Sequence, residues 1–285
     1  MPSPRPTPTR PRPSQEASQR CLRHGPVQRQ GRAIASVSAI FLAIAISGCA
    51  SAPSPTPQGP EQGTWAGRPI GKPPAPNPAV KRAIISRATR EWEYFGRQTV
   101  VYRGTEESIP HVGYWEDDDT GHSQRVNAYW RAVGQPGLDG MDCQKPWSAA
   151  FTGWVMQGAG VPEIQFRPSI AHWVYLSQAV EDAVFPGRWF VPRRITDYSP
   201  QPGDLICAAR GSNRPRMVGG YTSPSMLKGT STHCDLVIAK SGNTLEAIGG
   251  NVRNSVSRIS VELDANGRLQ TIPRRPWFMI LQNRL

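Results

Sequence analysis

The chain has 285 residues, 38% of them hydrophobic, and a formal net charge of +12 at pH 7. Half of that charge comes from residues 1–48, which contain seven Arg and one Glu. After residue 49 no dense Lys/Arg run is interleaved with aromatic residues, so we expect no nucleic-acid partner.

An uncharged apolar run covers residues 33–46 and follows a basic flank that includes Arg29 and Arg32. Because a transmembrane helix needs about 20 apolar residues, this shorter run is typical of a secretory signal. The run leads into Gly48-Cys49 and resembles the lipobox of bacterial lipoproteins. That resemblance implies a lipid on Cys49. Residue 50 is Ala rather than Asp, which implies an outer-membrane anchor facing the periplasm. The alternative is an ordinary signal peptide that ends by chance at a cysteine.

Three segments are therefore expected along the chain. Residues 1–48 form a lipoprotein signal with an extended Pro/Arg-rich leader. Residues 49–78 form a lipidated cysteine and a Pro-rich linker. Residues 79–285 are long enough for one domain with a sizeable core.

Helical patterns occupy the first half of this domain. Asn77-Pro78 is a helix start, and apolar residues then recur at helical spacing up to Gly96. The acidic segment 116–119 is predicted to be a solvated loop, with a calcium site as the alternative. Further helices are expected at residues 125–133, 146–159 and 169–180, the last of them capped by Ser169.

Strand patterns dominate after Arg194. Helices followed by strands predict an α+β fold in which N-terminal helices pack on an antiparallel sheet. The strands are expected at residues 204–209, 233–239, 244–248, 255–263 and 277–282, in addition to a short one at 99–102.

Four segments resemble papain-like cell-wall hydrolases of the NlpC and CHAP kinds. Trp147–Val155 is similar to their nucleophile helix, and Pro200–Ile206 to a strand that follows a Gly-Asp turn. Thr232–Ile238 is similar to the strand that carries the catalytic histidine, and Gly249–Asn251 to the segment with the third polar residue. The segment Trp147–Phe151 also resembles the bacterial family called domain of unknown function 2272.

The resemblance implies a papain-like fold and a role for three residues. Ser148 stands at the nucleophile position in place of cysteine, His233 is the base, and Asn251 orients the imidazole. A nucleophile in the first turn of a helix is favoured in its anionic form by the helix dipole. Since serine is not ionised at neutral pH, three readings stay open: a Ser-His hydrolase, a degenerate site that binds wall fragments, and a helix-start serine beside an unrelated site.

The cysteines supply a rival nucleophile and an expected disulfide. Cys143 lies five residues before Ser148, and it is either the alternative nucleophile, a loop thiol or half of a disulfide. Cys207 and Cys234 lie on strands expected to be neighbours, so we predict that they pair and leave Cys143 free.

Other polar residues have weaker roles. His172 either lines the groove or lies on the surface, Asp204 caps a turn, and Glu246 is a second candidate for orienting His233. No H-x-x-x-H or C-x-x-C motif occurs, so neither a metal nor another cofactor is expected. The expected partners are peptidoglycan or its stem peptides, and the membrane through the lipid on Cys49. The expected activity is amide hydrolysis, with a catalytically inactive wall-binding or scaffold lipoprotein as the alternative.

Overall fold

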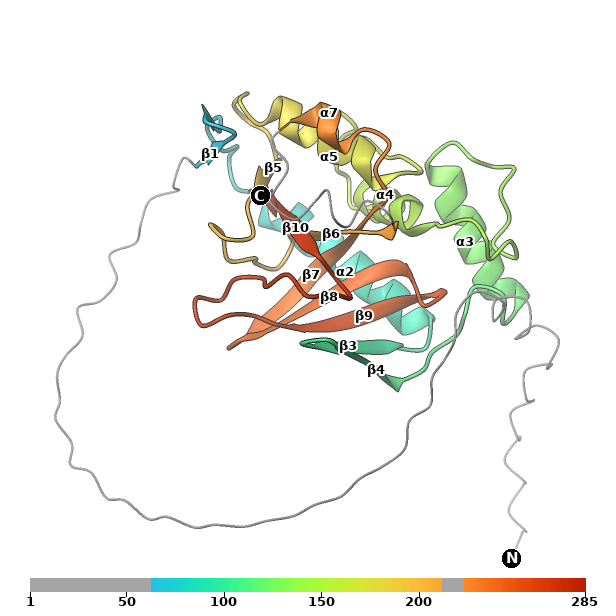
Figure 1. Ribbon diagram of the computed structural model, residues 1–285. Coiled ribbons are helices and arrows are strands. Elements are labelled where there is room, and N and C mark those ends of the chain that lie inside the picture. The colour runs from blue at the N-terminus through green and yellow to red at the C-terminus, as the bar shows by residue number, and fades with distance from the viewer. Residues whose placement is uncertain (1–62, 212–222) are drawn as a thin grey trace, which may run out of the picture.

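The computed structural model describes residues 63–211 and 223–285 (Figure 1). The expected signal segment and the lipid site at Cys49 lie outside the described residues. No helix in the described part of the chain is long and apolar enough to cross a membrane.

One eight-stranded sheet forms the centre of the fold, in the order β4-β3-β9-β8-β7-β6-β10-β5. Neighbouring strands are antiparallel except for β3 and β9, which are parallel. A separate two-stranded ribbon pairs β1 (Thr64–Trp65) with β2 (Arg68–Pro69). The eight strands are β3 (Thr99–Arg103), β4 (Glu106–His111), β5 (Phe190–Arg193), β6 (Leu205–Ala209), β7 (Thr232–Ser241), β8 (Thr244–Val252), β9 (Ser255–Glu262) and β10 (Trp277–Asn283).

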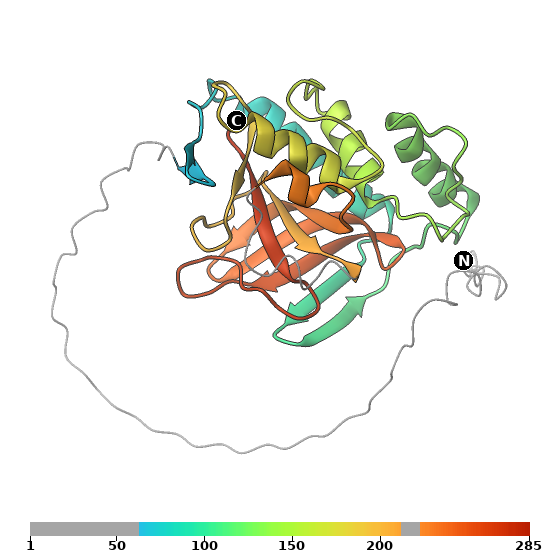
Figure 2. The same cartoon turned by 45° about the horizontal axis from the view of Figure 1, so that its top comes forward.

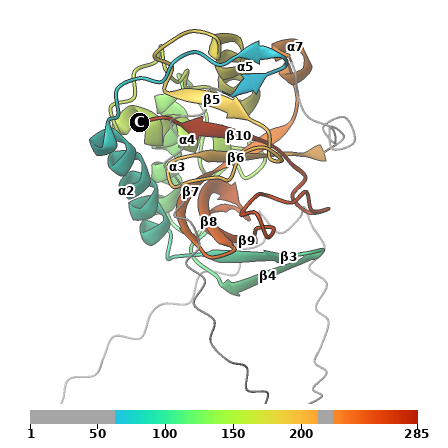
Figure 3. The same ribbon diagram turned by 90° about the vertical axis from the view of Figure 1, so that its left-hand side faces the viewer.

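Helices gather on one side of this sheet (Figures 2 and 3). Helices α2 and α4 pack on β7 and β8, and α5 packs on β5 and β7. The chain therefore has the predicted α+β architecture with a mostly antiparallel sheet. The helices are α2 (Pro78–Tyr94), α3 (Thr120–Ala132), α4 (Ser148–Gly158), α5 (His172–Asp182) and the short α7 (Pro224–Leu227).

Strand alternation divides the core into two clusters, one on each face of the sheet. In β7, Cys234 and Leu236 belong to the cluster that also contains Phe151 of α4. Val237 belongs to the second cluster, on the opposite face. By the same alternation His233 and Asp235 project with Val237, away from the helices.

The structure differs from the sequence predictions at several element ends. Helix α3 begins at Thr120 because the Asp119 side chain accepts a hydrogen bond from the His122 amide at 2.9 Å. Helix α5 begins at His172, and Ser169 instead accepts a bond from the Ala171 amide. Segment 116–119 is not fully solvated as expected. Glu116 and Asp117 are buried, and the Trp147 indole donates to the Glu116 carboxyl group.

The folded unit also begins before residue 79. Trp65 and Ile70 are buried in the helix-side core, and the Gly71 amide donates to the Ala183 carbonyl at 2.8 Å. These contacts place the last part of the expected linker against the domain.

Candidate functional site

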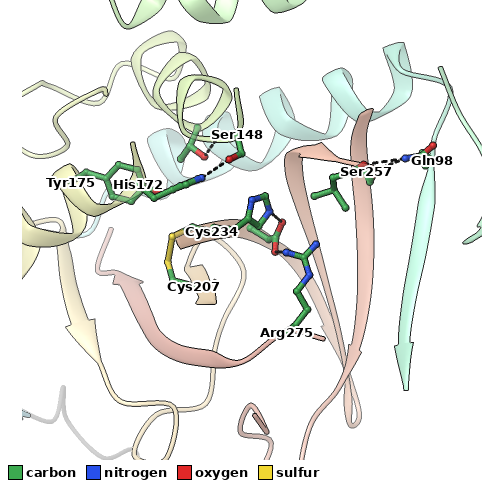
Figure 4. A network of polar contacts seen from close by, with 12 residues as sticks. Gln98, Ser148, His172, Tyr175, Cys207, Cys234, Ser257 and Arg275 are labelled. Atoms are coloured by element: carbon green, nitrogen blue, oxygen red, sulfur yellow. Dashed lines mark hydrogen bonds and ion pairs between the residues drawn. A yellow bond between two sulfur atoms is a disulfide. The ribbon is translucent and has the colours of Figure 1, made fainter. Parts of the chain in front are cut away.

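Ser148 is the first residue of α4 and its hydroxyl contacts an imidazole. Its Oγ lies 2.7 Å from Nε2 of His172, the first residue of α5 (Figure 4). Both side chains are nearly buried, with exposed fractions of 3% and 4%. Two helix starts therefore meet at one serine–histidine contact.

Two further hydroxyl groups extend this contact into a network. His172 Nδ1 lies 2.5 Å from the Tyr175 hydroxyl, and Thr152 Oγ1 donates to the Ser148 carbonyl at 3.1 Å. The Thr152 hydroxyl also interacts with the Tyr175 phenol and offsets part of the burial that raises the pKa of Tyr175. We call Ser148, His172, Tyr175 and Thr152 the hydroxyl network. Helical spacing explains it, because residues three and four apart share one face of a helix.

Donor chemistry fixes the direction of one bond in the hydroxyl network, and the His172 tautomer decides the direction of the others. A carbonyl only accepts, so the Thr152 proton points to Ser148 O. When His172 carries its proton on Nδ1 and donates to the Tyr175 oxygen, Nε2 keeps a lone pair that accepts the Ser148 proton. This is the tautomer that a general base needs.

The electrostatics of the helix start suit an anionic intermediate. Helix α4 has Trp147 as its N-cap residue and no capping side chain among the described residues. Its first backbone N–H groups are therefore available to a developing oxyanion. Burial, and then the nearby His233, lower the pKa of His172 well below its ordinary value, so its imidazole is neutral at pH 7.

His233 belongs to a second and charged group of side chains. Its Nε2 lies 2.7 Å from Oδ1 of Asp235, whose other oxygen lies 3.9 Å from Arg275 Nη1. We call these three residues the ionic chain. Burial lowers the pKa of His233 to about 4, even though Asp235 opposes that shift. A side chain at position 249 would strike the Asp235 carboxylate, because an added Cβ would lie 1.9 Å from Oδ1.

The prediction that His233 is the partner of Ser148 does not describe this geometry. Ser148 lies on the helix side, whereas alternation along β7 directs His233 to the opposite face. His172 occupies the expected position of the base, and its ring centroid lies 5.4 Å from that of His233. The two imidazoles are neighbours, but each has its own partner.

The expected orienting residues also have other places. Among described residues Asn251 makes no hydrogen bond to His233, and Asp235 holds that imidazole instead. Asn251 has a φ of 55° and lines the groove. Glu246 pairs with Arg258 at 3.4 Å, while Asp204 accepts bonds from the Gln201 and Asn283 amides and acts as the expected turn cap.

The cysteines are arranged partly as expected. Cys207 and Cys234 lie opposite each other on β6 and β7 and form a disulfide with Cα atoms 4.1 Å apart. The prediction that Cys143 is a free thiol is wrong for this structure, because Cys143 is also disulfide-bonded. While that bond is intact, the Cys143 sulfur cannot ionise to a thiolate and cannot act as the rival nucleophile.

Ser148 and His172 line a groove of about 1200 Å³. A smaller pocket of about 270 Å³ adjoins it and is lined by His233. The two share Asn251 and several charged residues on their walls. Within the described ranges no group of three or more His, Cys, Asp or Glu side chains could hold a metal ion.

Sequence reasoning missed Thr152, Tyr175 and Asp235. Thr152 and Tyr175 lie one helical turn from Ser148 and His172, on otherwise apolar buried faces. Asp235 lies two residues from His233 in an apolar strand, hence on the same face. The available signal was a polar residue on the same helix or strand face as a candidate catalytic residue, three or four positions away in a helix or two in a strand.

Comparison with curated proteins and with solved structures found no match. Residues 110–283, more than half of the chain, match the family model described as "Uncharacterized protein conserved in bacteria (DUF2272)". The match covers the hydroxyl network and the ionic chain. The chain therefore belongs to the bacterial family DUF2272.

Proposed function

We propose that this protein is a serine-dependent amide hydrolase that acts on the stem peptides of peptidoglycan. One observation carries the proposal: the Ser148 hydroxyl, at the start of a helix, lies 2.7 Å from Nε2 of a neutral His172 in the wall of a large groove. A serine nucleophile requires an adjacent base of this kind.

The reaction proceeds through an acyl-enzyme. Ser148 Oγ forms a bond to the amide carbon, and its proton moves to His172 Nε2. The backbone N–H groups at the start of α4 stabilise the oxyanion. As the C–N bond breaks, the leaving nitrogen takes the proton from His172. Water then adds to the ester, guided by the same imidazole, and the bond to Ser148 breaks.

The cell wall is proposed as the substrate because of the resemblance to NlpC and CHAP hydrolases. A nucleophile helix packed on a mostly antiparallel sheet supports a papain-like arrangement, with the base supplied from α5 rather than from β7. We further propose that the lipid on Cys49 anchors the domain to the outer membrane, facing the periplasm. In that case Cys49→Ala abolishes incorporation of labelled lipid, and lipid retained by the variant would contradict the anchor.

Purified mature protein incubated with intact wall sacculi tests the activity. We expect the wild type to release amino acids or peptide fragments and Ser148→Ala to release none. Ser123→Ala is the matched control, since Ser123 is also a buried helical serine whose hydroxyl donates to a backbone carbonyl. Equal release by Ser148→Ala and the wild type would refute the hydrolase.

A non-catalytic wall-binding protein is the second candidate. The nearly complete burial of Ser148 and His172 favours it, because a hydroxyl enclosed in a closed network also serves structure alone. This candidate predicts that the wild type retains wall fragments without cleaving them, and that Ser148→Ala retains them equally well.

A further inference from the structure

The small pocket beside His233 has an unusual set of charges. Four arginines line it, namely Arg210, Arg253, Arg274 and Arg275. Two carboxylates oppose them: Glu107 in the wall and Asp235 behind His233. With a neutral imidazole the pocket keeps an excess of positive charge, which favours an anionic group.

The opposing carboxylates do not use all the donors of the arginines. Arg253 contacts one Glu107 oxygen at 2.6 Å and 2.7 Å, and Arg274 lies 3.7 Å from the other oxygen. A guanidinium has five N–H donors in a fork that suits a carboxylate. Arg253 and Arg274 are also about half exposed, so a ligand can reach them.

The arginines need a hydrogen-bond acceptor from the ligand, whereas His233 needs a donor. An ionised carboxylate only accepts, so the nitrogen that faces Asp235 carries the proton and Nδ1 keeps a bare lone pair. Nδ1 is buried, and no described residue donates to it. A buried acceptor without a donor is costly, which points to a ligand that brings an N–H or O–H group.

The location links both requirements to the serine. The His172 and His233 rings are 5.4 Å apart, and Asn251 and Arg274 line both the pocket and the groove. That separation is about one to two residues of extended peptide. A volume of about 270 Å³ suits one small residue rather than a long chain segment.

We propose that this pocket holds the C-terminal residue of a peptide substrate, with its carboxylate on the arginines and its amide N–H on His233 Nδ1. Resting on the proposed function, this makes the enzyme a carboxypeptidase. Ser148 attacks the carbonyl of the preceding residue, the C–N bond breaks, and the released amino acid leaves with a proton from His172. Water completes the hydrolysis and regenerates the serine. Phosphate offers the negative charge and an O–H group, but not a carboxylate and an N–H group on one amino-acid residue.

Binding to the Ser148→Ala protein tests the subsite without requiring cleavage. The probes are N-acetyl-Ala-Ala with a free carboxylate and its C-terminal carboxamide, each in L,L and D,D forms, with inorganic phosphate as a third arm. We expect the free acid of one form to bind at least tenfold tighter than its carboxamide and than phosphate. Equal binding of acid and carboxamide would overturn the proposal, as would preferential binding of phosphate.

Two variants that should change the affinity for the free acid in opposite directions sharpen the test. Arg274→Gln removes a donor and should weaken binding of the free acid several-fold. Glu107→Gln removes a competing carboxylate and should tighten it. Arg103→Gln is the matched control, because Arg103 is an exposed arginine that pairs with Glu262 and does not line the pocket. No change in Arg274→Gln together with no change in Glu107→Gln would exclude the arginine wall as the anion site.

Cleavage assays separate this proposal from the hydrolase itself. If the wild type cleaves neither probe but still prefers the free acid, the subsite stands and the hydrolase fails. If it cleaves acid and carboxamide equally well, the hydrolase stands and the carboxypeptidase subsite fails.

Discussion

The two histidines of the site are neighbours in space but differ in what surrounds them. His172 lies at the start of a helix among uncharged hydroxyl groups, and each polar atom of its ring has a partner. His233 lies on a strand beside a carboxylate backed by an arginine, and one of its ring nitrogens has no donor among the described residues.

This difference indicates separate roles for the two imidazoles, proton transfer for His172 and ligand recognition for His233. A network in which both ring nitrogens have hydrogen-bond partners holds the imidazole in one orientation, which suits proton transfer from a nucleophile. A charged group with an unpaired acceptor needs a ligand to complete it, which suits recognition. The comparison predicts different consequences for mutations that look alike.

The largest expected difference is in catalysis. His172→Gln should lower kcat for peptide cleavage by about 10³-fold, because a side-chain amide cannot take the Ser148 proton. His233→Gln should act mainly through KM, by about tenfold. Steady-state kinetics on one peptide measure both. A larger loss of kcat in His233→Gln than in His172→Gln would reverse the assignment of the base.

The ionic chain should dominate stability. Asp235→Asn removes the fully buried carboxylate that pairs with Arg275 and holds His233, and should lower the free energy of unfolding by about 3–5 kcal/mol. Glu246→Gln breaks a pair with Arg258 that is about one-third exposed, and should lower the free energy of unfolding by about 1 kcal/mol or less. Urea unfolding of both variants provides the measurement. Similar losses of unfolding free energy in the two variants would mean that the ionic chain stabilises the fold no more than an exposed ion pair does.

The pH dependence of stability should separate the His233 contribution. Between about pH 6.5 and pH 4 the unfolded imidazole takes up a proton, whereas the folded one does not, because burial lowers its pKa to about 4. Its stabilising contribution is therefore complete above pH 6.5 and is lost as the pH falls toward 4. Asp235, Arg275, Arg210 and His172 are the charged or titratable groups around it.

Comparison of melting curves isolates this contribution. The melting temperature of the wild type should fall on acidification from pH 7 to pH 5 by about 5 °C more than that of His233→Gln. Glu116 and Asp204 act in the opposite sense, since burial raises the pKa values of these carboxyl groups to about 9 and about 7. The difference between variants removes their effect, and parallel curves would contradict a buried, neutral His233.

Much of the fold could be predicted from local sequence patterns. The start of α2 and five central strands follow from capping residues and alternation, because such signals act within a few residues. β4 and β5 were missed, since each is short and contains a proline that is atypical of a central strand.

The site was predicted less completely. Ser148 was identified from its helix start, but its partner depends on packing between α4 and α5 and on which face of β7 is turned to them. No local pattern reports how two helix starts meet. Alternation along β7 could have shown that His233 and Cys234 face opposite sides, and hence that a helix-side Cys234 directs His233 away from Ser148.

The smallest expected effect concerns the hydroxyl network and tests its direction. If the Tyr175 proton points to Thr152 in the wild type, then in Thr152→Val it loses its acceptor and is free to turn to His172 Nδ1. The imidazole then carries its proton on Nε2 and presents a donor, rather than a lone pair, to Ser148. Each lost hydrogen bond should lower the free energy of unfolding by only about 1 kcal/mol, whereas the tautomer should change completely. Nitrogen chemical shifts of His172 report the tautomer directly.

Thr89→Val is the control, since Thr89 also donates to a carbonyl four residues earlier, with no imidazole in the chain of bonds. If His172 keeps its proton on Nδ1 in Thr152→Val, the tautomer does not depend on the order of hydroxyl donors, and the helix-borne histidine is fixed by packing alone.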